Sequence, residues 1–180
     1  MAPDRDLLQR KLLSPENARE VRARLRQEGR RVVQCHGCFD IVHPGHIRYL
    51  RFAKAQGDVL IVSVSADAVV GKGFDRPYIN EELRLENLAA FEFVDWVYLD
   101  HNTSAVPVLE LLEPDVYIKG KEYETNADPR FLQEKALVEA NGGQVIFSSG
   151  DVVYSFSYII GKYRRQFGLE QERVSFFCRR

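Results

Sequence analysis

Short apolar runs alternate with segments of helical character along most of the chain, and this alternation restricts the folds that the chain can adopt. The apolar runs lie at residues 32–36, 59–64, 96–99, 116–119 and 145–147. The segments of helical character lie at residues 46–55, 81–93, 105–112, 129–140 and 155–167. Apolar strands separated by helices are typical of a parallel sheet that is buried on both faces. The pattern predicts a Rossmann-like α/β fold, in which a parallel five-stranded sheet carries helices on both faces.

A further helix is predicted before the first apolar run. Ser14 is followed by Pro15, and Gly29 comes 14 residues later. A serine N-cap, a proline in the first turn and a terminal glycine are the usual signals of a helix with defined ends. We therefore expect an N-terminal extension and packing helix in residues 1–29, the main domain in residues 30–168 and a C-terminal tail or linker in residues 169–180.

Length and charge exclude several classes of protein. A chain of 180 residues corresponds to about one domain, and its formal net charge of -1 shows no basic excess of the kind that nucleic-acid-binding proteins carry. No apolar run approaches the ~20 residues of a membrane span, and the N-terminus has no signal-peptide core. The three cysteines, an odd number, favour reduced thiols. We expect a cytoplasmic protein that binds neither nucleic acid nor membranes.

The residues that follow the first apolar run read GCFDIVHPGH, from Gly37 to His46, and are called the histidine loop below. His43 and His46 flank a proline and a glycine at the point where a helix is predicted to begin. Unpaired N–H groups and the helix dipole attract phosphate at a helix start, and imidazoles add further hydrogen-bond donors. Ligands of parallel α/β sheets bind at the carboxyl ends of the strands. The histidine loop is therefore predicted to be an anion site.

The same region raises the alternative of a zinc site. Cys35, Cys38, His43 and His46 form the pattern C-x2-C-x4-H-x2-H. The gap between the cysteine pair and the histidine pair is much shorter than the ~12 residues of a zinc finger. We favour the phosphate interpretation, in which Cys35 is a buried strand residue and Cys38 a small loop residue.

The histidine loop resembles GxFDxxHxGH, the signature of the HxGH nucleotidyltransferases, a superfamily that includes cytidylyltransferases and pantetheine-phosphate adenylyltransferases. The resemblance continues at residues 76–77, 94–97, 114–120 and 141–145. It is greatest to the heptose 1-phosphate adenylyltransferase domain of ADP-heptose synthases and spans roughly residues 30–165. It implies a Rossmann-like nucleotidyltransferase fold. It also implies transfer of a nucleoside monophosphate from a nucleoside triphosphate (NTP), which is bound with Mg2+, to a phosphorylated small molecule.

The resemblance implies roles for individual residues. It makes His43, His46 and Lys72 catalytic, stabilising charge on the α-phosphate and on the leaving pyrophosphate. The nucleotide-binding residues that it implies are Gly37, Cys38, Phe39, Asp40, Gly45, Arg84, Lys119, Ser155 and Ser157. No protein residue is assigned as a metal ligand.

Some positions leave alternatives open. Arg84 either contacts a phosphate, as the resemblance implies, or is a surface residue paired with Glu81 or Glu82. Residues 121–122, Lys-Glu, stand where the resembled proteins have Gly and Asp, and Phe156 stands where they have Thr. These departures motivate a non-catalytic nucleotide-binding module of a larger protein as one alternative function.

The resemblance favours ATP and a sugar 1-phosphate such as heptose 1-phosphate as the substrates. A CTP-dependent cytidylyltransferase acting on glycerol 3-phosphate or another alcohol phosphate is the close alternative. The resemblance further implies that the domain is fused to, or works with, a sugar kinase of the ribokinase type. The apolar residues of the C-terminal tail, residues 174–180, suit a linker or the contact of a homodimer.

Overall fold

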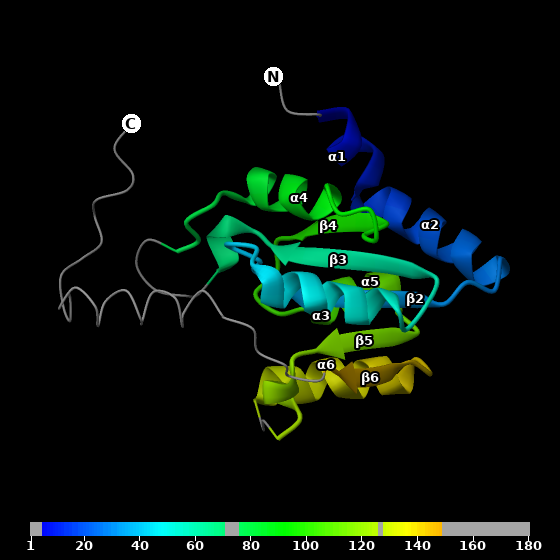
Figure 1. Cartoon of the computed structure of the whole chain (residues 1–180). Helices are drawn as coiled ribbons and strands as arrows, with labels where there is room; N and C mark the ends of the chain where they lie inside the picture. The colour runs from blue at the N-terminus through cyan, green and yellow to red at the C-terminus, as the bar shows by residue number, and fades with distance from the viewer. Residues whose placement is uncertain (1–4, 71–75, 126–127, 149–180) are drawn as a thin grey trace, which may run out of the picture.

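One parallel sheet runs through the computed structural model, which describes residues 5–70, 76–125 and 128–148 (Figure 1). The strands are β1 (Leu12–Leu13), β2 (Val32–Gly37), β3 (Val59–Ser65), β4 (Trp96–Asp100), β5 (Val116–Lys119) and β6 (Gln144–Phe147). The helices are α1 (Arg5–Lys11), α2 (Pro15–Gln27), α3 (Pro44–Lys54), α4 (Glu81–Ala89), α5 (Val106–Leu112) and α6 (Pro129–Ala140). Two short 3-10 turns, η1 (Asp67–Val69) and η2 (Lys121–Tyr123), follow β3 and β5.

The predicted α/β fold is confirmed, with one strand more than expected. The five predicted strands are present with ends that differ by at most one residue, and β1 pairs with β4 as the sixth. Because β1 has two residues, no periodicity marks it in the sequence. Lys11, just before it, donates to the backbone oxygens of Phe91 and Val94 at 2.9 and 2.8 Å. These bonds hold the N-terminal segment against the turn that follows α4. Through β1, residues before position 30 also form part of the sheet.

One predicted helix is shorter in the structure than expected, and another cannot be compared with it. α4 stops at Ala89 instead of continuing to residue 93, because the chain turns through Phe91, whose oxygen accepts from the Val94 N–H and from Lys11. The helix predicted at residues 155–167 lies outside the described residues.

Two apolar cores cover the two faces of the sheet. On one face α1, α3 and α4 pack through residues such as Leu50 and Leu88, both 0% exposed. On the other face α2, α5 and α6 pack through residues such as Leu25 and Leu109. The sheet is therefore buried on both sides, as its near-continuous apolar strands predicted.

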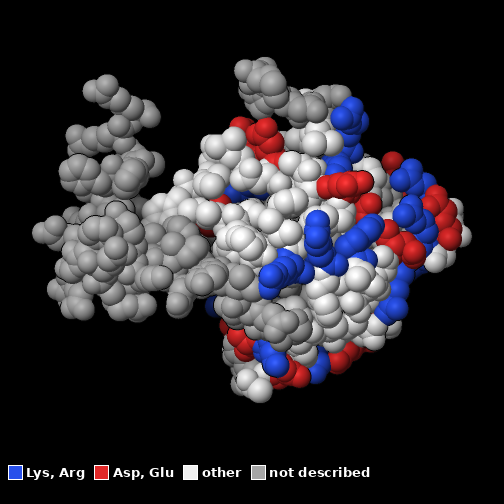
Figure 2. All heavy atoms as spheres, viewed as in Figure 1, with Lys and Arg blue, Asp and Glu red and all other residues white. Residues whose placement is uncertain are grey.

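The arginine-rich helix α2 carries its charges in local pairs. Arg26 lies 2.8 Å from Glu113, and Arg24 lies 3.8 Å from Glu28. Figure 2 shows basic and acidic side chains intermixed around α2, at the right of the view. The helix surface consequently has no single sign of charge, in line with the formal net charge of -1.

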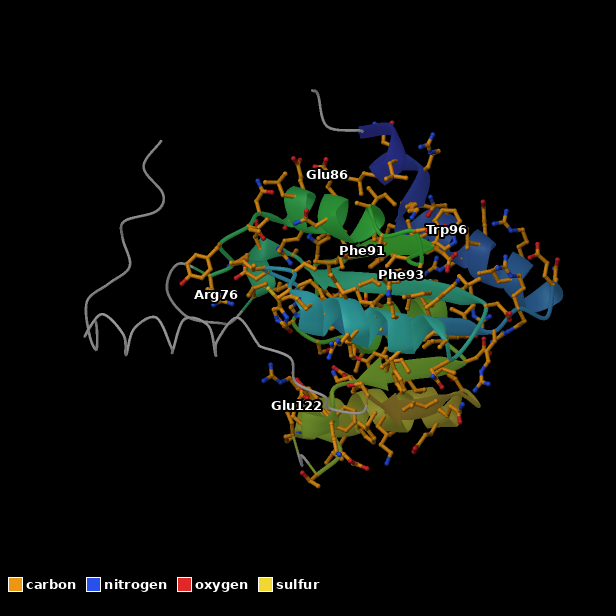
Figure 3. The ribbon with its side chains drawn as sticks, in the orientation of Figure 1. Arg76, Glu86, Phe91, Phe93, Trp96 and Glu122 are labelled. Carbon is orange, nitrogen blue, oxygen red and sulfur yellow. The ribbon has the colours of Figure 1, made fainter. Side chains whose placement is uncertain are left out.

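The strand order β1-β4-β3-β2-β5-β6 creates a switch point between β2 and β5. The chain leaves β2 toward β3 and β4, and returns through α5 to pair β5 with the other edge of β2. Ligands of such sheets bind at the carboxyl ends of strands beside the switch point. Arg76 and Glu122 lie at this end of the sheet, toward which the arrowheads of β3 and β5 point (Figures 1 and 3).

Candidate active site

The histidine loop leaves β2 at the switch point and turns sharply into α3. Gly37 ends β2, and a Cβ atom there would lie 3.2 Å from the ring of Phe39. Phe39 has a φ of 49°, in the left-handed region that non-glycine residues rarely adopt. Such a conformation costs on the order of 1–3 kcal/mol and persists only where surrounding contacts impose it. Here the residues on either side of Phe39 are held in place: the Cys38 oxygen accepts from Arg84, and the Asp40 carboxylate accepts from backbone N–H groups before α4.

His43 is the N-cap of α3. Its Nδ1 accepts a hydrogen bond from the Gly45 N–H at 3.1 Å, while Pro44 occupies the first turn. An Nδ1 that accepts has no proton, so the neutral ring carries its proton on Nε2. Partial burial lowers the pKa of His43, which favours this neutral form. His43 is thereby fixed as a donor through Nε2.

His46 lies one helical turn further along α3 and stacks on His43. The two ring centroids are 4.0 Å apart with 28° between the ring planes. The ring of Phe39 contacts His46 edge-on at 5.4 Å. The structure thus brings both predicted catalytic histidines together at the start of one helix, where backbone N–H groups also favour an anion.

Asp40 joins the histidine loop to the segment before α4. Its Oδ1 accepts from the N–H groups of Tyr78 and Ile79 at 2.8 and 3.0 Å, and its Oδ2 lies 2.7 Å from Arg76 Nε. The side chain of Asp40 is 4% exposed. We conclude that this carboxylate positions a second loop beside the histidines.

Arg84 is fully buried, so the alternative of a surface residue paired with Glu81 or Glu82 is wrong. Its guanidinium donates to the backbone oxygens of Cys38, Ser65 and Ile79 and to Asp67 Oδ1, which lies 2.7 Å away. These contacts join the loops that follow β2 and β3 to the start of α4. All three guanidinium nitrogens of Arg84 contact protein atoms. Arg84 therefore stabilises the arrangement of the histidine loop and its neighbouring loops.

A cavity of about 320 Å³ opens beside the histidine loop at the switch point. Gly37 and Cys38 form part of its wall, and Lys119, Tyr123 and Phe131 line it from β5, η2 and α6. Its volume is within the range of about 300–1,000 Å³ typical of small-molecule sites. The structure thus brings Lys119 to the same space as the first residues of the histidine loop.

Lys119 is held by a buried network with α6. Its Nζ lies 2.9 Å from Glu134 Oε2 and 3.3 Å from the Tyr117 hydroxyl, which itself donates to Glu134. Nζ also lies 4.3 Å from the centroid of the Tyr123 ring. Burial and the nearby Glu134 raise the pKa of Tyr117 well above its ordinary value. Lys119 therefore presents a positive charge at the cavity wall in a fixed position.

Sequence reasoning predicted Lys119 but missed the other members of a group of polar residues in this region, called the polar band below. It crosses four neighbouring strands and consists of Gln34, His36, Ser63, Ser65, Asp100 and Lys119. His36 Nδ1 lies 3.0 Å from Ser63 Oγ, and its Nε2 lies 3.3 Å from Ser65 Oγ. Burial lowers the pKa of His36, and the positive charge of Lys119 contributes, although the nearby Asp100 opposes the change. The only signal in the sequence is the presence of polar residues inside otherwise apolar runs.

The described residues contain no group of three or more His, Cys, Asp and Glu side chains placed to hold a metal ion. Cys35 and Cys38 are both buried, and burial raises the pKa of the Cys35 thiol to about 12. The zinc pattern read from these cysteines and the two histidines is therefore not assembled into a metal site.

Lys72, Ser155 and Ser157 lie outside the described residues. None of the described helices has the length and apolar character needed to cross a bilayer.

Comparison with known proteins was made on both sequence and structure. Bifunctional protein HldE of Azorhizobium caulinodans is 37% identical over 155 residues, which are 85% of this chain and 32% of that protein. HldE of Citrifermentans bemidjiense is 39% identical over 125 residues, or 68% of this chain and 25% of that protein. The chain thus spans about a quarter to a third of the length of these relatives.

Solved structures agree on the fold. A lipopolysaccharide core biosynthesis protein of Thermoplasma volcanium is 29% identical and superposes with a TM-score of 0.54, covering 66% of this chain and 94% of that one. Pantoate-beta-alanine ligase of Francisella tularensis, 16% identical, has a TM-score of 0.56, with 77% of this chain and 66% of that one covered. At that identity the ligase supports the fold alone.

The cytidylyltransferase-like family matches residues 34–170, a region that begins within β2 and includes the histidine loop and every described element that follows. This match covers most of the chain, and so the chain belongs to the cytidylyltransferase-like family of nucleotidyltransferases.

Proposed function

We propose that the chain transfers AMP from ATP to a sugar 1-phosphate such as heptose 1-phosphate and releases pyrophosphate. The observation that carries the proposal is the similarity to HldE proteins, 37% identity over 85% of this chain in one case. The stacked histidines at the start of α3 supply the charge-stabilising groups that the reaction needs. The resemblance to heptose 1-phosphate adenylyltransferase domains supplies the choice of base and acceptor.

The reaction needs positioning and charge stabilisation more than proton transfer. An oxygen of the acceptor phosphate attacks the α-phosphorus in line, forming a new P–O bond while the bond to the β-phosphate oxygen breaks. The acceptor phosphate is already ionised at neutral pH, so no general base is required. His43, a donor through Nε2, would stabilise charge on the α-phosphate, and His46 would act beside it.

Asp40 and Arg84 would act as positioning residues. They tie the histidine loop to the loops around it through backbone groups, so the imidazoles keep one orientation before substrate binds. Mg2+ would arrive with the triphosphate, whose oxygens are its preferred ligands, and would neutralise charge there.

The acceptor would come from a kinase that phosphorylates the sugar at its anomeric carbon. The relatives are bifunctional proteins, and this chain corresponds to about a quarter to a third of their length. We therefore infer that the chain is fused to, or works in sequence with, a sugar kinase.

The test is release of pyrophosphate in the presence of Mg2+. ATP, CTP, GTP and UTP are each offered with heptose 1-phosphate, with other sugar 1-phosphates and with glycerol 3-phosphate, and a His43→Asn variant serves as the control. We expect release with ATP and a sugar 1-phosphate and its loss in the variant. Release with CTP and glycerol 3-phosphate would replace the proposed substrates. Nucleotide binding without release from any pair would support a non-catalytic module.

A further inference from the structure

The polar band lies under the face of the sheet that α5 and α6 cover, where the neighbouring side chains are apolar. Gln34, Ser63 and Asp100 are 0% exposed, yet nothing in the histidine loop depends on their chemistry. Polar groups cost free energy when buried and are seldom kept without a structural or functional reason. The question is which of the two reasons applies.

A purely structural network would satisfy its own hydrogen bonds, and this one does not. Gln34 Nε2 donates to Ser63 Oγ at 3.1 Å, but Gln34 Oε1 has no hydrogen-bond partner among the described residues. Asp100 Oδ2 is likewise without one, and His36 Nδ1 lies 3.9 Å from it. Gln34 and Asp100 do not line the cavity, whereas three members of the band, His36, Ser65 and Lys119, do. The band therefore reaches a ligand only through those three side chains.

Counting hydrogens assigns the state of His36. The single proton of the Ser63 hydroxyl is donated to the Cys35 oxygen, so Ser63 Oγ accepts from His36 Nδ1–H. In the neutral ring, His36 Nε2 is then an acceptor, and its contact with Ser65 Oγ is long at 3.3 Å. Both His36 and Ser65 line the cavity. A ligand hydroxyl could donate to His36 Nε2 or exchange hydrogen bonds with the Ser65 hydroxyl.

The rest of the cavity has complementary chemistry. Two cations line it, Lys119, which is paired with Glu134 at 2.9 Å, and Arg130, which lies 3.7 Å from Asp128, and both carboxylates belong to the lining as well. The cations can bind a phosphate, the carboxylates can accept from ligand hydroxyls, and the rings of Tyr123 and Phe131 supply apolar walls for C–H groups. Gly37 and Cys38 connect this space to the histidine loop. A polyhydroxylated phosphate ester matches this combination better than a short alcohol phosphate, which offers few hydroxyls to the band.

We propose that the cavity is the acceptor subsite, that it selects a polyhydroxylated phosphate ester over a short one, and that His36 and Ser65 are the residues that make the selection. The proposal rests on the proposed function. A site built to bind ligand hydroxyls discriminates strongly against analogues without them, because its own polar groups are then left unpaired.

The experiment compares kcat/KM for heptose 1-phosphate with kcat/KM for glycerol 3-phosphate in the whole chain. Ser65→Ala and His36→Gln should raise the KM for heptose 1-phosphate about 5- to 10-fold each, the effect of one lost hydrogen bond. Neither should change the KM for ATP or the value for glycerol 3-phosphate by more than about 2-fold. The ratio of the two kcat/KM values therefore falls in both variants.

A matched control separates selection from general loss of stability. Ser14→Ala removes the hydroxyl that caps α2, far along the chain from the cavity, and should destabilise the protein without changing the ratio. If Ser65→Ala lowers kcat/KM for both acceptors equally, its role is structural and the proposal is overturned.

Calorimetric binding of heptose 1-phosphate, without nucleotide, separates the two proposals. Binding that Ser65→Ala weakens, with no pyrophosphate released, would preserve the acceptor subsite and contradict the proposed function. Turnover whose acceptor preference is unchanged in both variants would preserve the function and contradict the subsite. Absence of both binding and turnover would contradict both.

Discussion

The histidine loop directly follows β2, the strand that also carries Gln34 and His36 of the polar band, but the two regions use their polar groups differently. In and around the histidine loop, the side chains of Asp40 and Arg84 form hydrogen bonds with backbone groups of neighbouring segments. In the polar band, side chains bind one another, and Gln34 Oε1 and Asp100 Oδ2 are left over. The first region fixes the shape of the loops, whereas the second places His36, Ser65 and Lys119 at the cavity wall.

This difference shows what each region can tolerate. A buried arginine that serves several carbonyl groups cannot be shortened without leaving those groups unpaired, which costs about 1–3 kcal/mol for each. Among the described residues, a band member at the cavity wall such as Ser65 makes a single side-chain hydrogen bond, with His36, so we expect its substitution to cost less stability than that of Arg84. The two regions should therefore respond differently to equally conservative substitutions.

The largest effect is expected at His43, where chemistry and structure can be separated. His43→Ala removes both the donor to the phosphate and the cap of α3, whereas His43→Asn keeps an acceptor for the Gly45 N–H. We expect both variants to lose activity by roughly 100- to 1,000-fold, and the alanine variant alone to lose about 1 kcal/mol of stability. Steady-state kinetics and urea unfolding measure the two effects. If the asparagine variant remains active, His43 caps α3 but does not take part in catalysis.

Arg84→Lys should have the largest effect on stability. Lysine keeps the charge but cannot reach Ser65, Ile79 and Asp67 at once, so we expect a loss of about 3 kcal/mol in urea unfolding. Arg24→Lys, at an exposed position of α2, is the control and should change stability by less than about 0.5 kcal/mol. A variant of native stability with weakened ATP binding would instead return Arg84 to the phosphate-contacting role that the resemblance implies.

A pair of tyrosines compares a neutral hydrogen bond of α3 with a charged one beside Lys119 of the polar band. Tyr49, on α3, donates to the Ile118 oxygen at 2.6 Å, and Tyr117 donates to the Glu134 carboxylate at 2.9 Å. Hydrogen bonds to a charged group are worth about 1.5–3 kcal/mol and those between neutral groups about 1 kcal/mol. Tyr117→Phe should therefore lower the free energy of unfolding by about 2 kcal/mol and Tyr49→Phe by about 1 kcal/mol. Equal losses would mean that the charge of Glu134 adds nothing to its hydrogen bond with Tyr117.

The sequence predicts the scaffold of both regions far better than their contacts. The apolar runs define five strands to within one residue, and Ser14 and Pro15 mark the start of α2, because these signals are local. The contacts of Asp40 with residues 78–79 depend on a loop about forty positions away, which no local pattern encodes. The contribution of His36 is also hidden, because its partners come from β3 and β4.

The smallest expected effect is on the pH dependence of stability, and it compares the two histidines across the two regions. The pKa of both His36 and His43 is lowered from an ordinary value of 6.5, chiefly by burial. The unfolded chain then binds protons more readily than the folded one, so stability is fully present above pH 6.5 and falls as the pH drops below it. For each histidine the loss is bounded by about 1.4 kcal/mol per pH unit. His36 is the more deeply buried and also faces Lys119, so His36→Gln should remove more of the acid sensitivity than His43→Asn. Urea unfolding at pH 7.5 and at pH 5.5 measures the loss of stability in the original chain and in each variant. If His43→Asn removes more of this loss than His36→Gln, the negative charge of Asp100 compensates for the burial of His36. The polar band would then be arranged to hold a charged imidazole.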